Sequence, residues 1–156
     1  MSVSIVRLGT KRSAGEGLRI GTVRRPPRGV AKSRFASEDW YDVWFPTLAP
    51  STAVLKLGLA AKNERAWAAF ARRYRAEMAR PEASRALDLL AALSRRANFS
   101  VGCYCEDEAH CHRSLLRVLL AERGADVRSS RTPRARRAER KPTTRRAGRR
   151  LRAQAP

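Results

Sequence analysis

Short apolar runs predict three β-strands in this chain. Ser2 to Leu8 and Leu18 to Val23 are rich in β-branched residues, and each is bounded by glycine or proline. A third run, Phe99 to Cys105, has the same character and contains Gly102. Glycine inside a strand is typical of a position that another group approaches closely.

Helical spacing dominates the stretch between the second and third strands. Asn63 is a suitable N-cap for a long helix. Apolar residues then repeat on one helical face, which we expect to pack on the core: Trp67, Phe70, Ala71, Tyr74 and Met78. Pro81 suits the first position of a second helix, which runs to about Arg96.

Shorter elements complete the pattern. Ser51 or Thr52 caps a short helix that reaches toward Leu57, and Cys111 opens an amphipathic helix that Gly124 ends. Ala125 to Arg128 is a candidate edge strand. The aromatic segment from residue 37 to residue 45 has no clear pattern.

Alternation of strands and helices predicts the α/β class. We expect a small three-layer domain with a mostly parallel sheet over residues 1–127. From residue 128 to residue 156 the chain has no apolar period, and arginine, proline, threonine and alanine dominate. Such a composition predicts a disordered basic tail.

Charge adds a class of partner to this picture. The formal net charge is +20. The tail holds 12 basic residues and one acid, and the preceding domain holds 22 basic and 13 acidic residues. This excess favours polyanions as partners, including non-specific binding of nucleic acid by the tail. The alternative is a solubilising tail without a specific ligand.

Cysteine usage and the absence of apolar segments indicate a cytoplasmic protein. All three cysteines lie within nine residues, which is not the pattern of a secreted disulfide framework. The N-terminus lacks a signal-peptide pattern, and no stretch approaches the roughly 18 apolar residues that span a membrane.

The richest chemistry lies between Cys103 and Ser114, where a strand gives way to a helix. Ligands of open α/β sheets bind beyond the carboxyl ends of strands, and a helix N-terminus favours anions and thiolates. One interpretation is an anion or nucleotide site, with Cys111 as a reactive thiolate and His112 as an acid or base. Arg113 would then bind a phosphate or carboxylate.

Two other interpretations stay open. Cys103, Cys105, Cys111 and one histidine have the ligand types of a zinc site, but their spacing is not that of common zinc knuckles. Alternate residues of a strand also point to opposite faces. The third interpretation is purely structural, with buried cysteines and a locally paired arginine. The Cys-to-Arg spacing excludes a tyrosine-phosphatase loop, and the chain has neither a Walker loop nor a G-x-G-x-x-G motif.

Two segments together resemble the YeaO-like bacterial family, the domain of unknown function numbered 488. The first is Leu18 to Gly29 with the following Trp40 and Pro50-Ser51-Thr52, and the second is Cys105-Glu106 with Cys111-His112-Arg113-Ser114. The resemblance spans about Ile5 to Gly124. It implies a small α/β domain and no established activity.

One departure from the family lies in the basic loop. Members usually have Asp-Arg-Leu-Trp-Pro-Arg-Gly where this chain has Val-Arg-Arg-Pro-Pro-Arg-Gly at residues 23–29. An acid and a tryptophan are therefore replaced. Arg24 and Arg28 remain as matches.

These patterns lead to one hypothesis for the site. We expect a small anionic, nucleotide-like ligand at the strand ends, with Cys111 and His112 as candidate catalytic groups. Its expected ligand-binding residues are Arg24, Arg28, Arg113 and Ser114. No bound metal is expected, and the sequence specifies neither a cofactor nor a reaction.

Cutting the chain after Val127 tests the tail. If the tail binds nucleic acid, the truncated protein should lose most of its affinity for duplex DNA. The basic residues of the tail would neutralise phosphates and release the counterions condensed on the DNA, and this release favours binding. Fluorescence anisotropy over a salt series measures this, with a slope of roughly −0.9 per phosphate neutralised. Unchanged affinity and slope after truncation would assign the binding to the folded domain instead.

Overall fold

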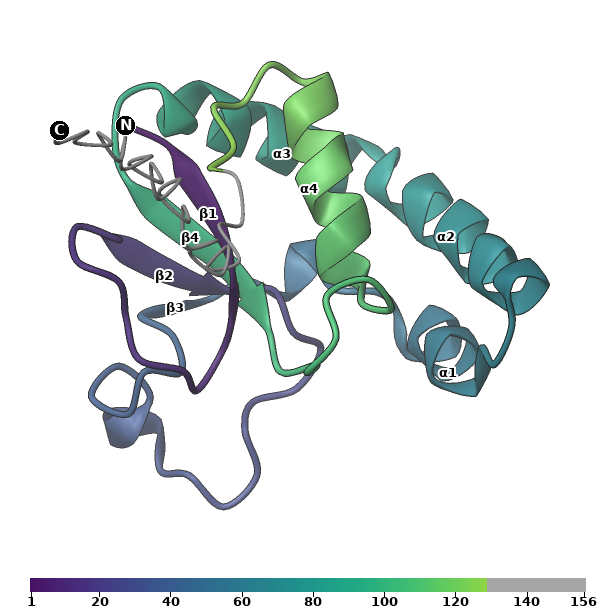
Figure 1. Cartoon of the computed structure of the whole chain (residues 1–156), viewed down its shortest axis with the longest axis horizontal. Helices are drawn as coiled ribbons and strands as arrows, with labels where there is room; N and C mark the ends of the chain where they lie inside the picture. Colours follow the sequence, from purple (N-terminus) through teal and green to yellow (C-terminus); the bar gives the residue numbers. More distant parts are fainter. Residues whose placement is uncertain (129–156) are drawn as a thin grey trace, which may run out of the picture.

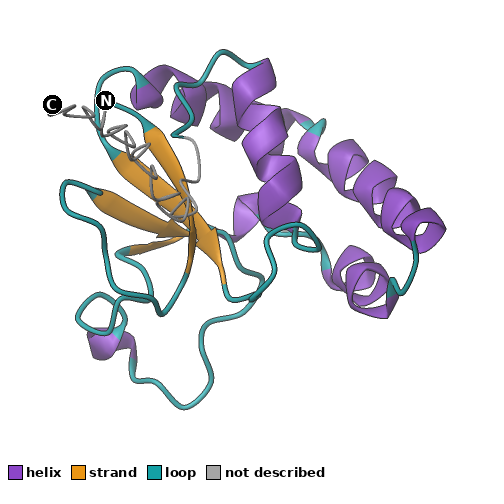
Figure 2. Ribbon diagram, in the orientation of Figure 1, coloured by secondary structure: helices purple, strands orange, loops and turns teal. Residues whose placement is uncertain are grey.

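A computed structural model describes residues 1–128 of the chain, with four strands and four α-helices (Figures 1 and 2). The strands are β1 (Val3–Arg7), β2 (Leu18–Gly21), β3 (Val43–Trp44) and β4 (Phe99–Cys103). The helices are α1 (Thr52–Ala60), α2 (Glu64–Met78), α3 (Pro81–Ser94) and α4 (His112–Glu122). The predicted disordered tail spans residues 128–156, and all of it except residue 128 lies outside the described residues.

The four strands form one parallel sheet in the order β1-β4-β2-β3. β4 lies between β1 and β2 and is buried along its whole length. Val127 adds a single parallel bridge to Val3, so the expected edge strand at residues 125–128 is reduced to one bridge. The α/β class and the parallel sheet are confirmed.

Helices cover one face of the sheet, and loops cover the other (Figure 1). Alternate strand residues point toward the helices and form the main core with side chains of all four helices. They include Val3, Ile20, Phe99 and Val101. On the opposite face the loop side chain of Tyr41 packs over a strand glycine. The layers are therefore helices, sheet and irregular loops.

Glycines let the loop layer approach the sheet closely. A Cβ atom on Gly102 would lie 2.6 Å from Leu8 Cδ2, and one on Gly21 would lie 2.4 Å from Tyr41 Cδ1. Real Cβ contacts are not this short, so both positions need the small residue. The glycine predicted to mark a close approach in the third strand does so at Gly102.

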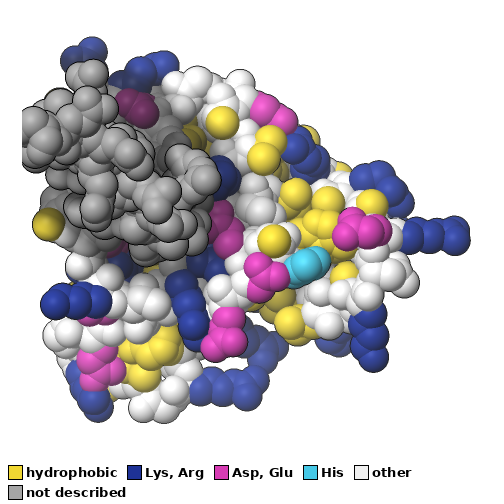
Figure 3. All heavy atoms as spheres, in the orientation of Figure 1, with side chains coloured by type: hydrophobic (Ala, Val, Ile, Leu, Met, Phe, Trp, Pro, Cys, Tyr) yellow, Lys and Arg dark blue, Asp and Glu magenta, His cyan; other side chains and the backbone are white. Residues whose placement is uncertain are grey.

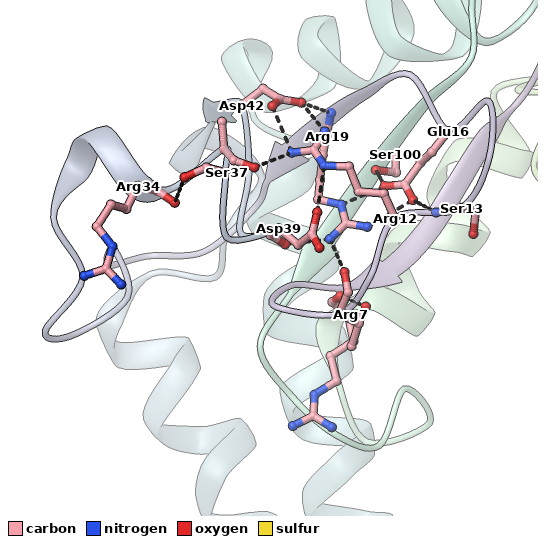
Figure 4. Close-up of polar contacts among 12 residues, drawn as sticks. Arg7, Arg12, Ser13, Glu16, Arg19, Arg34, Ser37, Asp39, Asp42 and Ser100 are labelled. Atoms are coloured by element: carbon pink, nitrogen blue, oxygen red, sulfur yellow. Dashed lines mark hydrogen bonds and ion pairs between the residues drawn. The ribbon is translucent and has the colours of Figure 1, made fainter.

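A buried ion pair holds the loop face together (Figure 4). Arg19 is fully buried and its Nε lies 2.7 Å from Glu16 Oε1. Its Nη1 also donates to the carbonyl oxygens of Thr10 and Asp39. The hydroxyl of Ser100 on β4 donates to the same carboxylate. Buried charges of this kind are stable only when paired and hydrogen-bonded, so the network fixes the loop against the sheet.

Most helix boundaries follow the predicted caps. Ser51 accepts a hydrogen bond from Val54 N, and Asn63 accepts one from Ala66 N. Pro81 occupies the first turn of α3, and Cys111 is the N-cap residue of α4. The short strand β3 arises in the aromatic segment that had no clear pattern.

The ends of the strands agree less well with the sequence prediction. β4 stops at Cys103 rather than Cys105, and β2 stops at Gly21 rather than Val23. In both cases the chain leaves the sheet to form the cavity described below. Within residues 1–128, no helix is both long and apolar enough to cross a bilayer.

Replacing Glu16 with glutamine tests the buried pair. The substitution leaves the Arg19 charge buried without a counter-ion, which costs about 3–5 kcal/mol of unfolding free energy. Urea unfolding monitored by circular dichroism measures the loss. The matched control is Glu122→Gln, which breaks the exposed Arg75–Glu122 pair and should cost less than about 1 kcal/mol.

Acid gives a second test of the same pair. Burial by itself raises the pKa of Glu16, but hydrogen bonds from Arg19, Ser100 and the Ser13 N–H outweigh it, so the pKa lies below its usual value. A depressed folded-state pKa stabilises the fold above the unfolded pKa, and the stabilisation disappears as pH falls through the folded pKa. The stability difference between wild type and Glu16→Gln should therefore shrink below about pH 4.5. A constant difference down to pH 2 would contradict this account.

Candidate functional site

A large cavity opens at the carboxyl ends of β1, β2 and β4. Its volume is about 720 Å³. Residues one or two positions after these three strands form much of its wall, including Leu8, Val23 and Tyr104. The position agrees with the general rule that ligands of parallel α/β sheets bind beyond the carboxyl strand ends.

Two kinds of side chain line this cavity. Aromatic and aliphatic groups come from separate segments of the chain: Val23, Trp40, Pro50, Leu55, Leu59 and Tyr104. Basic groups come from β1 and the proline-rich loop: Arg7, Arg24, Arg25 and Arg28. An apolar wall with a few charged groups is typical of small-molecule sites.

Arg24 and Arg28 both line the cavity, as predicted, but they differ in what they contact. The Arg24 guanidinium donates to the carbonyl oxygens of Pro50 (2.9 Å) and Ala49 (2.7 Å), just before α1. It is therefore engaged in holding the loop to the start of that helix. Arg28 is exposed, and among residues 1–128 its side chain has no hydrogen-bonding partner.

A cluster of cysteines and one histidine lies at the floor of the cavity. The sulfurs of Cys103 and Cys111 and a ring nitrogen of His112 all lie within 4.8 Å of one another. Cys105 Sγ lies 3.7 Å from Cys103 Sγ. Cys103, Cys105 and His112 line the cavity, whereas Cys111 is only 2% exposed and lies behind its wall.

Both ring nitrogens of His112 have neighbours. Nε2 lies 2.8 Å from the carbonyl oxygen of Thr22, which only a ring N–H can satisfy, so the proton belongs on Nε2. Nδ1 is then unprotonated and faces Cys111 Sγ at 3.8 Å. The hydrogen bond joins α4 to the end of β2 and fixes the ring orientation.

The pKa values of the three thiols are shifted by their mutual contacts. Hydrogen bonding with the Cys103 thiol lowers the pKa of Cys105 and that of Cys111. The same hydrogen bonds raise the pKa of Cys103. The positive charge of Arg113 further lowers the pKa of Cys105. The contacts among the three thiols therefore favour loss of a proton from Cys105 and Cys111 over loss from Cys103.

Arg113 does not share the cavity with Arg24 and Arg28. It is 3% exposed, and its Nη2 donates to the carbonyl oxygen of Cys105 at 2.6 Å. Its Nε is buried without a hydrogen-bond partner in the described part of the chain. Arg113, expected from the sequence to bind the same ligand as Arg24 and Arg28, therefore lies apart from them, because α4 directs it beneath the cysteine loop.

Ser114 also acts locally. Its hydroxyl donates to the carbonyl oxygen of Cys111 at 2.9 Å and does not line the cavity. Of the six expected site residues, Arg24, Arg28 and His112 line the cavity. Cys111, Arg113 and Ser114 lie around the floor of it.

The sequence analysis did not predict several of the residues that line the cavity. Trp40, Leu55 and Leu59 come from segments whose position relative to the motif depends on tertiary structure. Arg25 belonged to the predicted basic loop but was not singled out. The sequence analysis named Cys105 only as a possible zinc ligand. Because β4 ends at Cys103, the chain turns there and Cys105 comes to line the cavity.

The family comparison matches nearly the whole described chain. A family model with the description "Active DUF488-N3 subclade" matches residues 3–124. The searches of curated proteins and of solved structures found no match. The match covers both the basic loop and the cysteine-rich motif.

The different contacts of Arg24 and Arg28 predict different effects on stability. Arg24→Met should lower the unfolding free energy by about 1–3 kcal/mol, because two carbonyl oxygens lose a charged donor. Arg28→Met should change it by less than about 0.5 kcal/mol, because an exposed side chain without partners is removed. Chemical denaturation of both variants measures this. Equal losses would contradict the structural role of Arg24.

Proposed function

The chain belongs to the DUF488 family and matches the model of the N3 subclade. On that premise we propose that the cavity at its strand ends binds a small anionic, nucleotide-like ligand. The Cys-His-Arg motif forms the floor of this binding site. The proposal concerns the ligand class and leaves the reaction unassigned.

The observation that supports this proposal most strongly is that two arginines at the cavity have no acidic partner. Arg25 and Arg28 are exposed, line the cavity and have no carboxylate partner among residues 1–128. Arg7, a third guanidinium at the cavity, pairs with the exposed carboxylate of Glu106. Arginines that line one cavity without a carboxylate partner favour an anionic ligand in that cavity. Arginine suits phosphate and carboxylate because its planar fork bonds two oxygens at once.

The apolar wall supports a ligand with more than an anionic group. Trp40 and Tyr104 meet edge to face with ring centroids 5.7 Å apart, and Leu55 and Leu59 come from α1. A base or another flat ring gains contact area on such a surface. The volume of about 720 Å³ lies within the usual range for small-molecule sites, roughly 300–1,000 Å³.

A chemical role for the motif rests on His112. It lines the cavity, whereas Cys111 lies behind the wall. The matching family model, which is described as an active subclade, covers the whole motif. Under the proposal, His112 and Cys111 keep the catalytic assignment made from the sequence, with His112 as the member that meets the ligand.

A second candidate function is nucleic-acid association through the basic tail. The charge of residues 128–156, with 12 basic residues against one acid, favours it. On the face seen in Figure 3, basic side chains are spread over several elements rather than gathered in one stripe. The tail is therefore the better candidate for such contacts than this face of the domain.

Removing the two free arginines tests the proposed ligand class. Wild-type protein should bind nucleoside monophosphates more tightly than the matching nucleosides, because the phosphate adds charge-assisted hydrogen bonds. The double variant Arg25→Ala/Arg28→Ala should weaken monophosphate binding by about 10- to 100-fold and leave nucleoside binding unchanged. Isothermal titration calorimetry with AMP, GMP, CMP and UMP and their nucleosides measures both.

The matched control is a double variant that removes the same number of positive charges from a surface away from the cavity. Arg72→Ala/Arg73→Ala removes two exposed arginines from α2 and should bind like wild type. If both double variants lose affinity equally, the effect is one of net charge and the cavity assignment is wrong. If wild-type protein binds none of the eight compounds, the nucleotide-like class is wrong.

A further inference from the structure

We infer that Cys103, Cys111 and His112 bind a zinc ion, with Cys105 as the fourth ligand. The inference does not depend on ligand binding in the cavity above the cluster, but it replaces the catalytic assignment of Cys111 and His112, because zinc ligands cannot also act as a free thiolate and a free base. The argument rests on distances, on the hydrogen bond of His112 and on the charge of Arg113.

The distances between ligand atoms fit a tetrahedral centre. With zinc–sulfur bonds near 2.3 Å, two sulfurs of a tetrahedral site lie roughly 3.8 Å apart, and sulfur and nitrogen lie slightly closer. Cys103 Sγ and Cys105 Sγ are 3.7 Å apart, and Cys111 Sγ and His112 Nδ1 are 3.8 Å apart. The atoms of Cys103, Cys111 and His112 already lie within 4.8 Å of one another. Cys105 is not one of these three residues, so its side chain has to turn toward Cys111 and His112 to complete the site.

The orientation of His112 is that of a metal ligand. A zinc-bound imidazole usually donates its other N–H to a carbonyl or carboxylate, which fixes the ring. Here Nε2–H donates to the carbonyl oxygen of Thr22 at 2.8 Å, and the lone pair of Nδ1 faces the sulfurs. The exposed His110, in contrast, contacts Asp107 and belongs to no such cluster.

Arg113 supplies the charge that such a centre needs. Three thiolates and one Zn²⁺ carry a net charge of −1. Arg113 is 3% exposed, pairs with no carboxylate among residues 1–128, and has a buried Nε without a partner. A buried guanidinium without a counter-ion is strongly unfavourable. A zinc–thiolate centre next to Cys105, whose carbonyl Arg113 already holds, gives it one.

The fold removes both objections that the spacing raised. β4 ends at Cys103, so Cys105 is not held to the alternation of a strand. Cys111 is the N-cap residue of α4 and His112 is its first residue, so the turn into the helix brings both toward the strand end. A loop of five residues between Cys105 and Cys111 closes the site.

Zinc suits this donor set better than other common divalent ions. Thiolates and imidazole favour zinc in tetrahedral geometry, whereas calcium, magnesium and manganese favour oxygen ligands. On binding, each of the three thiols loses its S–H proton to solvent, and His112 binds in its neutral form with its proton on Nε2. Zinc affinity therefore falls as pH falls.

Metal analysis of the full chain tests the inference directly. Protein purified without chelators from zinc-supplemented cells should contain about one zinc per chain by elemental analysis. His112→Gln should lose most of this zinc, and the matched control His110→Gln should keep it. Retention of zinc by His112→Gln together with its loss from His110→Gln would overturn the ligand set.

Cobalt spectroscopy keeps the test valid if a ligand variant does not fold. Wild-type protein stripped with a chelator and titrated with Co²⁺ should show the strong visible absorption of a tetrahedral site. Cys105→Ser should reduce the thiolate-to-cobalt charge-transfer band by about one third, since one of three sulfurs is lost. The inference is overturned if the purified protein holds no stoichiometric zinc and Co²⁺ gives no tetrahedral spectrum. Three thiols that react freely with a disulfide reagent in that protein would instead support the reactive-thiolate interpretation.

Discussion

The parallel pairing of β4 with both β1 and β2 is the constraint on which the rest of this structure depends. Because the three strands run in the same direction, their carboxyl ends meet at one edge of the sheet. The basic loop after β2 and the cysteines after β4 are far apart in sequence, yet this pairing brings them to one cavity. The helix α4 starts at the same edge, adds His112 to the cavity wall and buries Arg113 beneath Cys105.

The two faces of the sheet contribute differently to that arrangement. The helical face supplies most of the apolar core, with Phe99 and Val101 of β4 among its buried members. The loop face is held by the buried pair of Glu16 and Arg19 and by close approach at Gly21 and Gly102. Without that loop layer, Tyr41 and Trp40 would not be held beside the strand ends. The loop network therefore shapes the cavity as much as the helices do.

Local patterns in the sequence predicted the elements better than they predicted the site. The caps at Asn63 and Ser51 and the apolar stripe of α2 depend on neighbouring residues, and the structure confirms them. The buried position of Arg19 depends on an acid three residues earlier and on a serine 81 residues later, so no local pattern reveals it. Arg113 was expected in the cavity because of its motif, but the direction of α4 buries it beneath Cys105. The role of Arg24 likewise depends on carbonyl groups 25 and 26 residues away.

The central claim is that a ligand binds in the cavity at the strand ends, and the tryptophan side chains report on it directly. Of the three tryptophans, Trp40 lines the cavity, whereas Trp44 and Trp67 do not. In a two-dimensional nitrogen–proton NMR spectrum, each indole N–H gives its own signal. Titration with a nucleoside monophosphate should shift the Trp40 signal saturably and leave the Trp44 and Trp67 signals in place. A saturable shift at Trp67 with Trp40 unmoved would contradict the account.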